Sequence, residues 1–465
     1  MKHFNPFEKD INALSSPDLL KLKSVTEGWY VEYKREIPKS DSIAKSISAL
    51  ANSYGGWLFY GIEEESKQNS VAGRFLGIPT SEVDAALQRI RLAVANGMNP
   101  ACHFEVIAIY GPCDIICLPA ERAVICIAVP QSSEAPHIHN KGVIYRRIAD
   151  ASEPAHETDR HMIEKMFSRG KKTDESFKEW VHTPLELSDE EHSLPIIRLL
   201  ITPNLWSMPR PGFLLTPKIT RDILNNTENR KITLPFDNFY SSSRGIVARQ
   251  CTGGNSIYSA ITWTIHRDLR SEITIPLPLN KGNLNTIEGS LSHYKHTNQF
   301  IKSLKKSGLT NVGVVDLNII FNVLQGIVAA QRALLKQVNW PQKFHIKVQL
   351  LNNWRNTSFL DIDSYLDHIT EFGPPICLNK ECIYPSGYSP NTFWEVENNQ
   401  ELPDEDIQTL AQTTWSFLPI AAAFGVPISM IIDDKYDPET NPTSILTKLR
   451  AAGALAQKKM NANQK

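Results

Sequence analysis

The sequence predicts an α+β protein in two parts, a smaller N-terminal domain and a larger C-terminal region. Near the N-terminus, short strand-like runs of apolar residues alternate with amphipathic helices. After a polar stretch that begins at Gly170, further strand candidates are mixed with long apolar helices. The length of 465 residues allows several domains, and 42% hydrophobic and 21% charged residues are typical of a soluble globular protein.

Charge, cysteine content and the length of apolar runs limit the classes of protein to which this chain can belong. The formal net charge is -1, so any nucleic-acid surface must be a local patch and not a global excess of positive charge. Seven cysteines in a chain of this size do not indicate a disulfide framework. The first residues lack the apolar core of a signal peptide, and no apolar run reaches the roughly 18 residues of a membrane span. We therefore expect a cytoplasmic protein without a membrane partner.

Two acidic residues near the N-terminus set a geometric requirement. A short helix begins near Ser16, and a strand is predicted over 29–37. Glu27 and Glu32 are five residues apart, which places them on opposite faces of any continuous strand. They can converge only if the chain bends near Gly28, so we expect a bend there.

The next segment leads to a third acidic position. A helix is predicted over 42–52 and an apolar strand, buried on both faces, over 57–62. Gly55 and Gly56 between them suit a backbone with positive φ or a close approach to a ligand. A run of three glutamates, 63–65, follows at the exposed end of that strand. Later elements are predicted as a helix over 80–95, strands over 104–110, 122–129 and 142–147, and a helix from 158 to about 169.

From about Leu187 the pattern changes to a mixed α+β region. Its predicted strands are 196–201, 245–251, 256–265, 272–277 and 344–351, and its predicted helices are 317–337, 404–424 and 442–458. We divide the chain into an N-terminal domain over 1–172, a linker over 173–186, and a module over 187–465 that senses a trigger or recruits a protein partner. A division of this module into two subdomains is left open.

Three carboxylates and a lysine suit phosphodiester hydrolysis. Mg²⁺ or Mn²⁺ held by Glu27, Glu32 and Glu64 would polarise a phosphoryl oxygen and lower the pKa of the attacking water. Lys34 lies on the same strand face as Glu32, where it would stabilise developing negative charge. The alternative is a surface ion pair between Glu32 and Lys34 and a solvated run over 63–65. Which of the three glutamates in that run is the third acid stays open.

Basic residues near these acids are candidates for binding nucleic acid, because phosphates are usually held by lysine and arginine. The candidates are Arg35, Lys39, Lys45, Arg146 and Arg147. Arg146 and Arg147, at the end of a strand, form the best pair. The alternative is that these residues are ordinary surface charges.

Cysteine and histidine residues in the middle of the N-terminal domain raise the question of zinc. They are Cys102, His103, Cys113, Cys117, His137 and His139. Their spacing matches no zinc pattern well, and Cys117 and Cys126 lie in apolar, strand-like surroundings. We favour buried free thiols and do not expect a structural zinc.

The order of these motifs closely resembles the Schlafen-type AlbA-like domain. That family has a Glu, then Val-Glu-Phe-Lys, then Ala-Phe-Ala-Asn-Thr-x-Gly-Gly, then Gly-Val-Asp-Asp, and later a Tyr-x-Arg strand. Here the corresponding residues are Glu27, 31–34, 49–56, 61–64 and 143–147. The resemblance covers about residues 12 to 168. The third acid departs from the family pattern, because Glu64 stands where aspartate is usual, and the longer side chain can change geometry or metal preference.

The resemblance implies a mixed sheet with helices and, as in the nuclease members, a metal-dependent site that cuts structured RNA such as tRNA. Glu27, Glu32 and Glu64 would be its metal ligands. We therefore expect a metal-dependent endoribonuclease, which in a bacterium would suit a toxin-like or phage-defence effector. Other members are described only as nucleic-acid- or nucleotide-binding modules. A non-catalytic nucleic-acid-binding or regulatory protein and an assembly subunit are thus the alternatives.

The resemblance also bears on the oligomeric state. Mammalian Schlafen cores pair two related lobes into a groove for folded RNA, whereas this chain has one clear copy. We therefore expect a homodimer or higher oligomer that builds the groove from two subunits. The sequence leaves open the nucleic acid that is cut, the activating trigger and the ligand of the C-terminal module.

Overall fold

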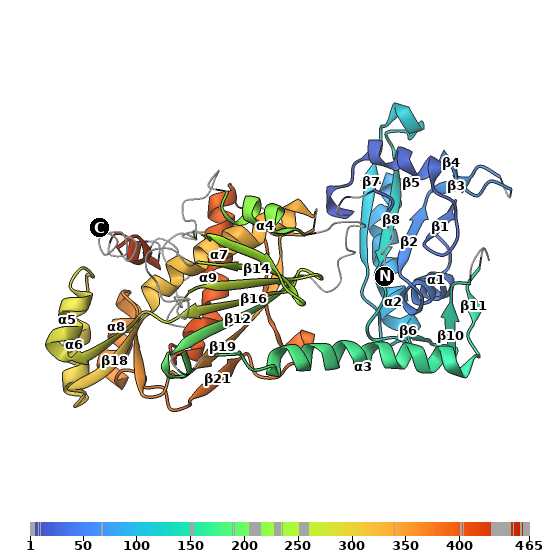
Figure 1. The fold of residues 1–465 in the computed structure, drawn as a ribbon. Helices are drawn as coiled ribbons and strands as arrows, with labels where there is room; N and C mark the ends of the chain where they lie inside the picture. The colour runs from blue at the N-terminus through green and yellow to red at the C-terminus, as the bar shows by residue number, and fades with distance from the viewer. Residues whose placement is uncertain are drawn as a thin grey trace. The chain divides into compact units, whose positions relative to one another are not determined.

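The computed structural model describes all residues except 1–4, 8, 10, 67, 149–152, 188, 190, 204–214, 227–233, 235, 251–259, 339, 400–401, 403, 429–447, 450, 456–457 and 459–465. The chain forms two compact units (Figure 1). Unit 1 consists mainly of Met1–Trp180, and unit 2 contains most of the remaining chain. The α+β fold class predicted from the sequence is confirmed.

Unit 1 is built on a five-stranded sheet with apolar inner strands. Its strands are β1 (Val31–Lys34), β2 (Gly56–Tyr60), β5 (Ile78–Pro79), β7 (Glu105–Tyr110) and β8 (Arg122–Val129). The order is β1-β2-β8-β5, and β7 also pairs with β8. β1 and β2 are parallel, and a parallel pair needs a crossover connection, which is supplied by α1 (Ser40–Asn52). The helix predicted over 42–52 therefore joins the two strands that flank the acidic residues.

Both faces of this sheet are covered, as the apolar strand predicted over 57–62 requires. On one face, Leu58 and Tyr60 pack with α1 and α2 (Val83–Gly97). On the other face, Trp57 and Phe59 pack against Phe7, with centroid distances of 5.3 and 5.9 Å. The 3-10 helices η1 (Ile11–Ala13) and η2 (Ser16–Ser24) contribute apolar side chains to this second cluster.

Smaller elements complete unit 1. They are β3 (Ile62–Glu64), β4 (Ala72–Phe75), η3 (Thr80–Glu82), β6 (Met98–Asn99), η4 (Asp114–Ile116), β9 (Ile138–His139), β10 (Val143–Arg146) and β11 (Ala155–His156). β3 and β4 form a hairpin directly after β2. β11, β10, β9 and β6 form a second sheet, and β10 packs against α1. This contact brings Arg147, directly after β10, toward the strand that carries Glu32.

The linker predicted over 173–186 starts as a helix. α3 spans Arg160–His182 (Figure 1) and does not end near Arg169 as the sequence had indicated. Two features extend it: an ion pair between Lys171 and Glu175 one turn apart, and the burial of Phe177 and Trp180. Gly170 does not break the helix, and its missing side chain leaves room for the carbonyl of Ser133.

Unit 2 is centred on an eight-stranded antiparallel sheet. Its strands are β12 (Ile196–Pro203), β13 (Asn238–Ser241), β14 (Gly245–Arg249), β15 (Thr262–His266), β16 (Ser271–Pro276), β19 (Phe344–Leu351), β21 (Glu381–Tyr384) and β22 (Trp394–Val396). The order is β13-β14-β15-β16-β12-β19-β21, with β22 also paired with β19. The predicted strands 196–201, 245–251, 272–277 and 344–351 lie within or overlap these elements. The predicted strand 256–265 begins at Thr262 in the described part of the chain.

A second sheet and several helices surround this core. The three-stranded sheet consists of β17 (Leu279–Asn283), β18 (Asn311–Asp316) and β20 (Asn356–Phe359). The helices are α4 (Pro217–Leu224), α5 (Leu284–Leu291), α6 (Thr297–Lys306), α7 (Leu317–Gln337), α8 (Asp363–Phe372) and α9 (Glu405–Ala423), with the 3-10 helices η5 (Glu191–Ser193) and η6 (Pro390–Thr392). The predicted helix over 442–458 lies largely outside the described residues.

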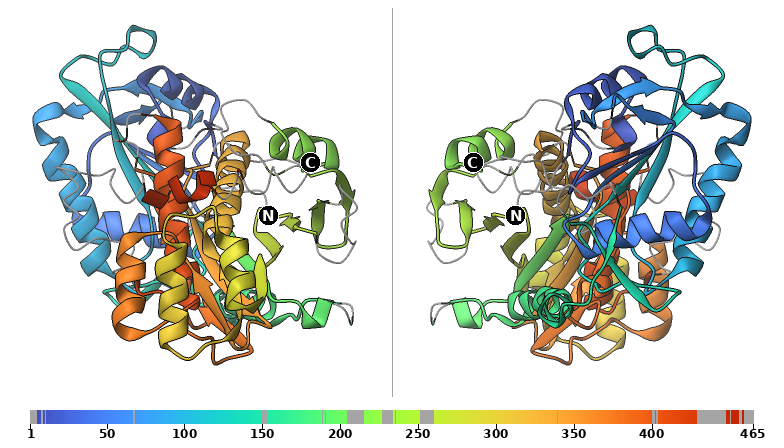
Figure 2. Two further views of the ribbon diagram at one scale, coloured as in Figure 1. Left: turned by 90° about the vertical axis from the view of Figure 1, so that its left-hand side faces the viewer. Right: turned by 90° about the vertical axis from the view of Figure 1, so that its right-hand side faces the viewer.

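α7 is the central helix of unit 2. By length and composition it could cross a membrane, but 78% of its most apolar window is buried inside the protein, as in a core helix. It runs beside α9 in Figures 1 and 2, and Phe321 meets Phe417 at a centroid distance of 5.3 Å. Arg332 of α7 also donates hydrogen bonds to Gln408 and Gln412 of α9.

Candidate functional site

The bend required near Gly28 is present. Residues 27–30 leave the strand direction, and the amide of Gly28 donates to the carbonyl of Val31 over 3.0 Å. Arg147 stabilises the bend, because its Nε and Nη2 donate hydrogen bonds to the Gly28 carbonyl over 3.2 and 2.6 Å. The Glu27 carboxylate consequently folds back along β1, where Oε1 accepts the amide of Tyr33 over 3.0 Å. Glu27 and Lys34 thus come to the same place.

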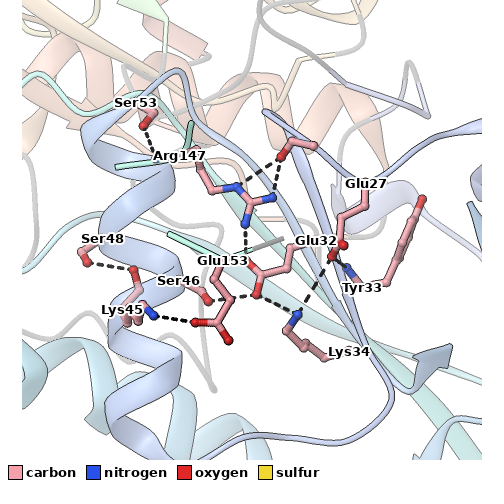
Figure 3. Close-up of polar contacts among 11 residues, drawn as sticks. Glu27, Glu32, Tyr33, Lys34, Lys45, Ser46, Ser48, Ser53, Arg147 and Glu153 are labelled. Carbon is pink, nitrogen blue, oxygen red and sulfur yellow. Dashed lines mark hydrogen bonds and ion pairs between the residues drawn. The ribbon is translucent and has the colours of Figure 1, made fainter. Parts of the chain in front are cut away.

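Glu32 is buried behind this bend, with 2% of its side chain exposed (Figure 3). Oε2 accepts from Arg147 Nη1 over 3.1 Å, and Oε1 accepts from Ser46 Oγ over 3.0 Å. Lys34 Nζ lies 3.3 Å from Oε1. Charged and neutral donors therefore satisfy a carboxylate that water does not reach.

The asparagine and serine at the end of α1 explain why Arg147 reaches Glu32. Asn52 is buried, and its side-chain amide bonds the main chain directly before β9 and within β10: it donates to the carbonyls of His137 and Tyr145 and accepts from the amide of His137. Ser53 Oγ accepts the amide of Arg147 over 2.9 Å. The Ala-Asn-x-x-Gly-Gly element therefore anchors the strand from which Arg147 extends.

Glu27 meets Glu64, the last residue of β3. Burial raises the pKa of Glu27 to about 7. A hydrogen bond that the protonated Glu27 carboxyl donates to Glu64, and the negative charge of Glu64, act in the same direction, while Lys34 and the amide of Tyr33 oppose them. A carboxyl pair that crowds negative charge in a partly buried place is suited to binding a cation. Of the three glutamates among which the sequence left the third acid open, Glu64 is the one that acts on Glu27, and its role as a metal ligand stays a prediction.

The neighbours of Glu64 have other partners. Glu63 pairs with Arg35 over 3.5 Å and with Arg74. Glu65 accepts a hydrogen bond from Asn69 within the turn of the hairpin. Glu64 alone of the three therefore faces Glu27.

An open pocket of about 400 Å³ lies in front of these residues. Its lining residues are Tyr33, Lys34, Arg35, Ile62, Glu63, Glu64 and Ser66. Lys34 Nζ, which is 4.0 Å from Glu27 Oε1 and 3.3 Å from Glu32 Oε1, belongs to a side chain that is 38% exposed. One ammonium group, one guanidinium group and two carboxylates thus border one solvent-accessible space.

The three predicted metal ligands do not form one set. Within the described residues, no group of three or more His, Cys, Asp or Glu side chains is placed to hold a metal ion. Glu27 and Glu64 lie together, whereas Glu32 is turned toward Arg147. Mg²⁺ is often bound by one or two carboxylates, with water and substrate phosphate completing its coordination. The Glu27–Glu64 pair fits such a cation, and Glu32 takes a supporting position.

Two of the predicted nucleic-acid-binding arginines are not free to bind phosphate. The prediction for Arg147 is corrected, because its side chain is fully buried and its guanidinium donates to the Glu32 carboxylate and to the Gly28 carbonyl. Arg146, which is 22% exposed, forms an ion pair with Glu157. Neighbouring residues in a strand point to opposite sides, so one of two adjacent arginines turns inward.

The remaining basic candidates lie at the surface, and one was missed. Arg35 is 62% exposed, Lys39 is exposed, and Lys45 pairs with Glu153 over 2.8 Å. Arg74 on β4 is 71% exposed beside Arg35, and both pair with Glu63. The hairpin register sets Arg74 opposite Glu63, a pairing that the local sequence pattern does not reveal.

Of the six cysteines and histidines considered for zinc, four are buried, namely Cys102, Cys113, His137 and His139. Cys102, Cys113 and Cys126 are buried free thiols, whereas Cys117 is exposed, contrary to its predicted apolar setting, because it follows the short helix η4 in a turn. The ring nitrogens of His137 and His139 contact the carbonyls of Pro100 and Asp41.

Comparison with known families identifies this region. Residues 27–156 match the family described as Schlafen, AlbA_2. This segment is a Schlafen AlbA-like domain. The match begins at Glu27 and includes Glu32, Lys34, Glu64 and Arg147. The rest of the chain has no family match. The Schlafen AlbA-like domain is associated with nucleic-acid-binding or nuclease-like function.

Other comparisons add little. The crystal structure of the DIP2311 protein from Corynebacterium diphtheriae is similar at 21% identity, with a TM-score of 0.19. The similarity covers 27% of this chain and 25% of that chain. No curated protein matches.

Proposed function

We propose that this protein is a metal-dependent endoribonuclease that acts on structured RNA such as tRNA. The observation that carries the proposal is the pairing of Glu27 and Glu64 beside Lys34 at an open pocket in the Schlafen AlbA-like domain. Two carboxylates next to a cation fit a site for one divalent metal ion and the phosphate on which it acts.

Each residue of the site has a separate task in this proposal. Glu27 and Glu64 hold Mg²⁺ or Mn²⁺, which when bound polarises a phosphoryl oxygen and makes water more acidic. The Lys34 ammonium donates to a phosphate oxygen, which stabilises the negative charge that develops there. Glu32 fixes Lys34, and Arg147 fixes both Glu32 and the bend that carries Glu27.

Exposed cations at the rim of the pocket supply the phosphate contacts. Arg35 follows β1 and Arg74 lies on β4, and both pair with Glu63, so the two arginines are held in place while their side chains stay mostly exposed. Lys39, which is exposed directly before α1, adds a further cation, whereas Lys45 is 26% exposed and paired with Glu153. In our proposal the active form is a homodimer or higher oligomer, and unit 2 receives a trigger or protein partner for an antiviral or toxin-like effector.

Cleavage of tRNA by the purified full chain in Mn²⁺ tests the proposal. We expect fragments on a denaturing gel, no fragments with excess EDTA, and none from Glu64→Gln. Glu65→Gln is the matched control, because this neighbouring carboxylate contacts Asn69 and not Glu27. Equal cleavage by Glu64→Gln and the unsubstituted protein would overturn the assignment.

A second candidate function is nucleic-acid binding without cleavage. It is favoured by the position of Glu32, whose carboxylate is occupied by Arg147, Ser46 and Lys34. Tight binding of tRNA with no cleavage in Mn²⁺ or Mg²⁺, at several pH values, would support this function over the first.

A further inference from the structure

Two aromatic side chains, Tyr54 exposed and Trp29 half-buried, lie at the bend that carries Glu27. Trp29 is within the bend, between Glu27 and Glu32 in sequence, and Tyr54 follows the end of α1. Their ring centroids are 5.5 Å apart and their planes are inclined by 70°. Tyr54 is 37% exposed and Trp29 is half-buried.

These two rings are not part of the core. The two hydrophobic clusters described for unit 1 include Trp57 and Phe59, and Tyr30 packs at the edge of one of them. Trp29 and Tyr54 belong to neither cluster. Large rings that are kept at the surface and against each other offer flat apolar area to a ligand.

The main chain beneath both rings is fixed. On one side of Trp29 the Gly28 carbonyl accepts from Arg147, and on the other side the Tyr30 carbonyl accepts the amide of Trp57 over 2.6 Å. Next to Tyr54, Ser53 Oγ accepts the amide of Arg147. Arg147 therefore holds the neighbours of both rings as well as Glu32. The main chain therefore fixes both rings relative to the acidic site, so little ordering is needed when a ligand binds.

We infer that Trp29 and Tyr54 form a stacking platform for an unpaired nucleobase of the RNA, a few nucleotides at most from the phosphate at Glu27 and Glu64. The inference rests on the proposed function. Every nucleobase has an aromatic face, and unpaired bases stack on exposed aromatic side chains. Bases inside a duplex are already stacked, so the platform selects loops, bulges or ends within structured RNA.

The composition of the surroundings agrees with a polynucleotide ligand. Lys34 ends β1, the strand that follows the bend, and Arg35 comes directly after it. Lys39 precedes α1 and Lys45 lies within it, and this helix ends at Asn52, two residues before Tyr54. A base on the rings and backbone phosphates on these cations together match the two parts of a nucleotide.

Binding experiments with two labelled RNAs test this inference. One RNA is a hairpin with an unpaired loop and the other is a blunt duplex of the same length, and fluorescence anisotropy is measured in EDTA to prevent cleavage. We expect Trp29→Ala to weaken hairpin binding by about tenfold to a hundredfold, as loss of one stacked base does. Trp29→Phe should retain most of the affinity, and duplex binding should change little in either variant.

Tyr110→Ala is the matched control, since this ring is 53% exposed at the end of β7 and makes no part of the bend. Its hairpin affinity should equal that of the unsubstituted protein. The platform is overturned if Trp29→Ala binds both RNAs with the affinity of the unsubstituted protein, or if its affinity falls equally for both. It is also overturned if Trp29→Ala changes the oligomeric mass without changing the affinity for RNA. Failure of the unsubstituted protein to bind either RNA, in EDTA or in Mn²⁺, overturns the proposed function instead.

Discussion

Arg147 and Glu32 form a buried ion pair in which Nη1 donates to Oε2 over 3.1 Å and the two side chains are 0% and 2% exposed. The same guanidinium donates twice to the Gly28 carbonyl. A buried ion pair is weak support for net stability, because the cost of desolvating two charges offsets their attraction. Its effect here is positional, since one side chain sets both the bend at Glu27 and the carboxylate that fixes Lys34.

Replacing Arg147 with alanine should destabilise the protein strongly. The change leaves the Glu32 carboxylate buried without its charged partner, which costs about 3–5 kcal/mol of unfolding free energy. Urea denaturation, followed by circular dichroism, measures it. Arg35→Ala is the control: it removes an exposed arginine paired with Glu63 and should cost less than about 1 kcal/mol.

The double variant Glu32→Gln/Arg147→Met separates pairing from general damage. Because both charges are removed together, it should be more stable than the sum of the two single changes predicts. Additive losses would show that the two residues are not energetically coupled, contrary to the contact described here.

Divalent cations should stabilise the folded protein through Glu27 and Glu64. A ligand that binds only the folded state raises stability by about 2.7 kcal/mol at a hundred times its dissociation constant. We therefore expect Mn²⁺ to raise the melting temperature, measured by differential scanning fluorimetry, and EDTA to reverse the rise. Glu64→Gln should abolish the shift and Glu65→Gln should keep it. An equal shift in both variants would place the cation elsewhere.

Several features of the site could be predicted from local pattern. The five-residue spacing of Glu27 and Glu32 required a bend, and strand alternation placed Glu32 and Lys34 on one face. The structure has both features. Neither inference needed information from distant parts of the chain, because backbone geometry alone determines which neighbours can meet.

Other features depended on partners far away in sequence. Strand alternation predicts that Arg146 and Arg147 point to opposite sides of the sheet. It does not predict which of them points inward, because that depends on the ion pair of Arg147 with Glu32, 115 residues earlier. Glu64 is distinguished from Glu63 and Glu65 only by the hairpin register and by Glu27. The helical start of the expected linker was missed because Gly170 suggested a helix end, while its packing against Ser133 is a tertiary contact.

The stability of unit 2 should depend on pH through Lys347 of β19. This side chain is fully buried, Nζ donates to the carbonyls of Pro385 and Thr392, and burial lowers the pKa of Lys347 to about 8. Between this value and the unfolded value of about 10.4, the unfolded chain binds more protons than the folded one. The contribution of Lys347 to the unfolding free energy therefore rises with pH across that window and is constant below it.

Comparison with Lys347→Met isolates this contribution from other titrating groups. The stability of the unsubstituted protein relative to the variant should rise by roughly 2 kcal/mol between pH 7.5 and pH 10, measured by urea denaturation. Lys336→Met, at a side chain that is 65% exposed, serves as the control and should show no such trend. A constant difference for Lys347→Met across this range would contradict the lowered pKa.

Alanine should destabilise the protein strongly at one of two glycines near the site and have little effect at the other. A Cβ on Gly56 would lie 2.4 Å from the Tyr30 carbonyl, which accepts the amide of Trp57, so Gly56→Ala must displace the bend. We expect a loss of more than about 2 kcal/mol in urea denaturation. A Cβ on Gly28 would meet nothing within 4 Å, so Gly28→Ala should change stability by less than about 1 kcal/mol. The bend would then depend on Arg147 and Trp57, which hold its carbonyls, and not on the freedom of Gly28; a large loss in Gly28→Ala would reverse that conclusion.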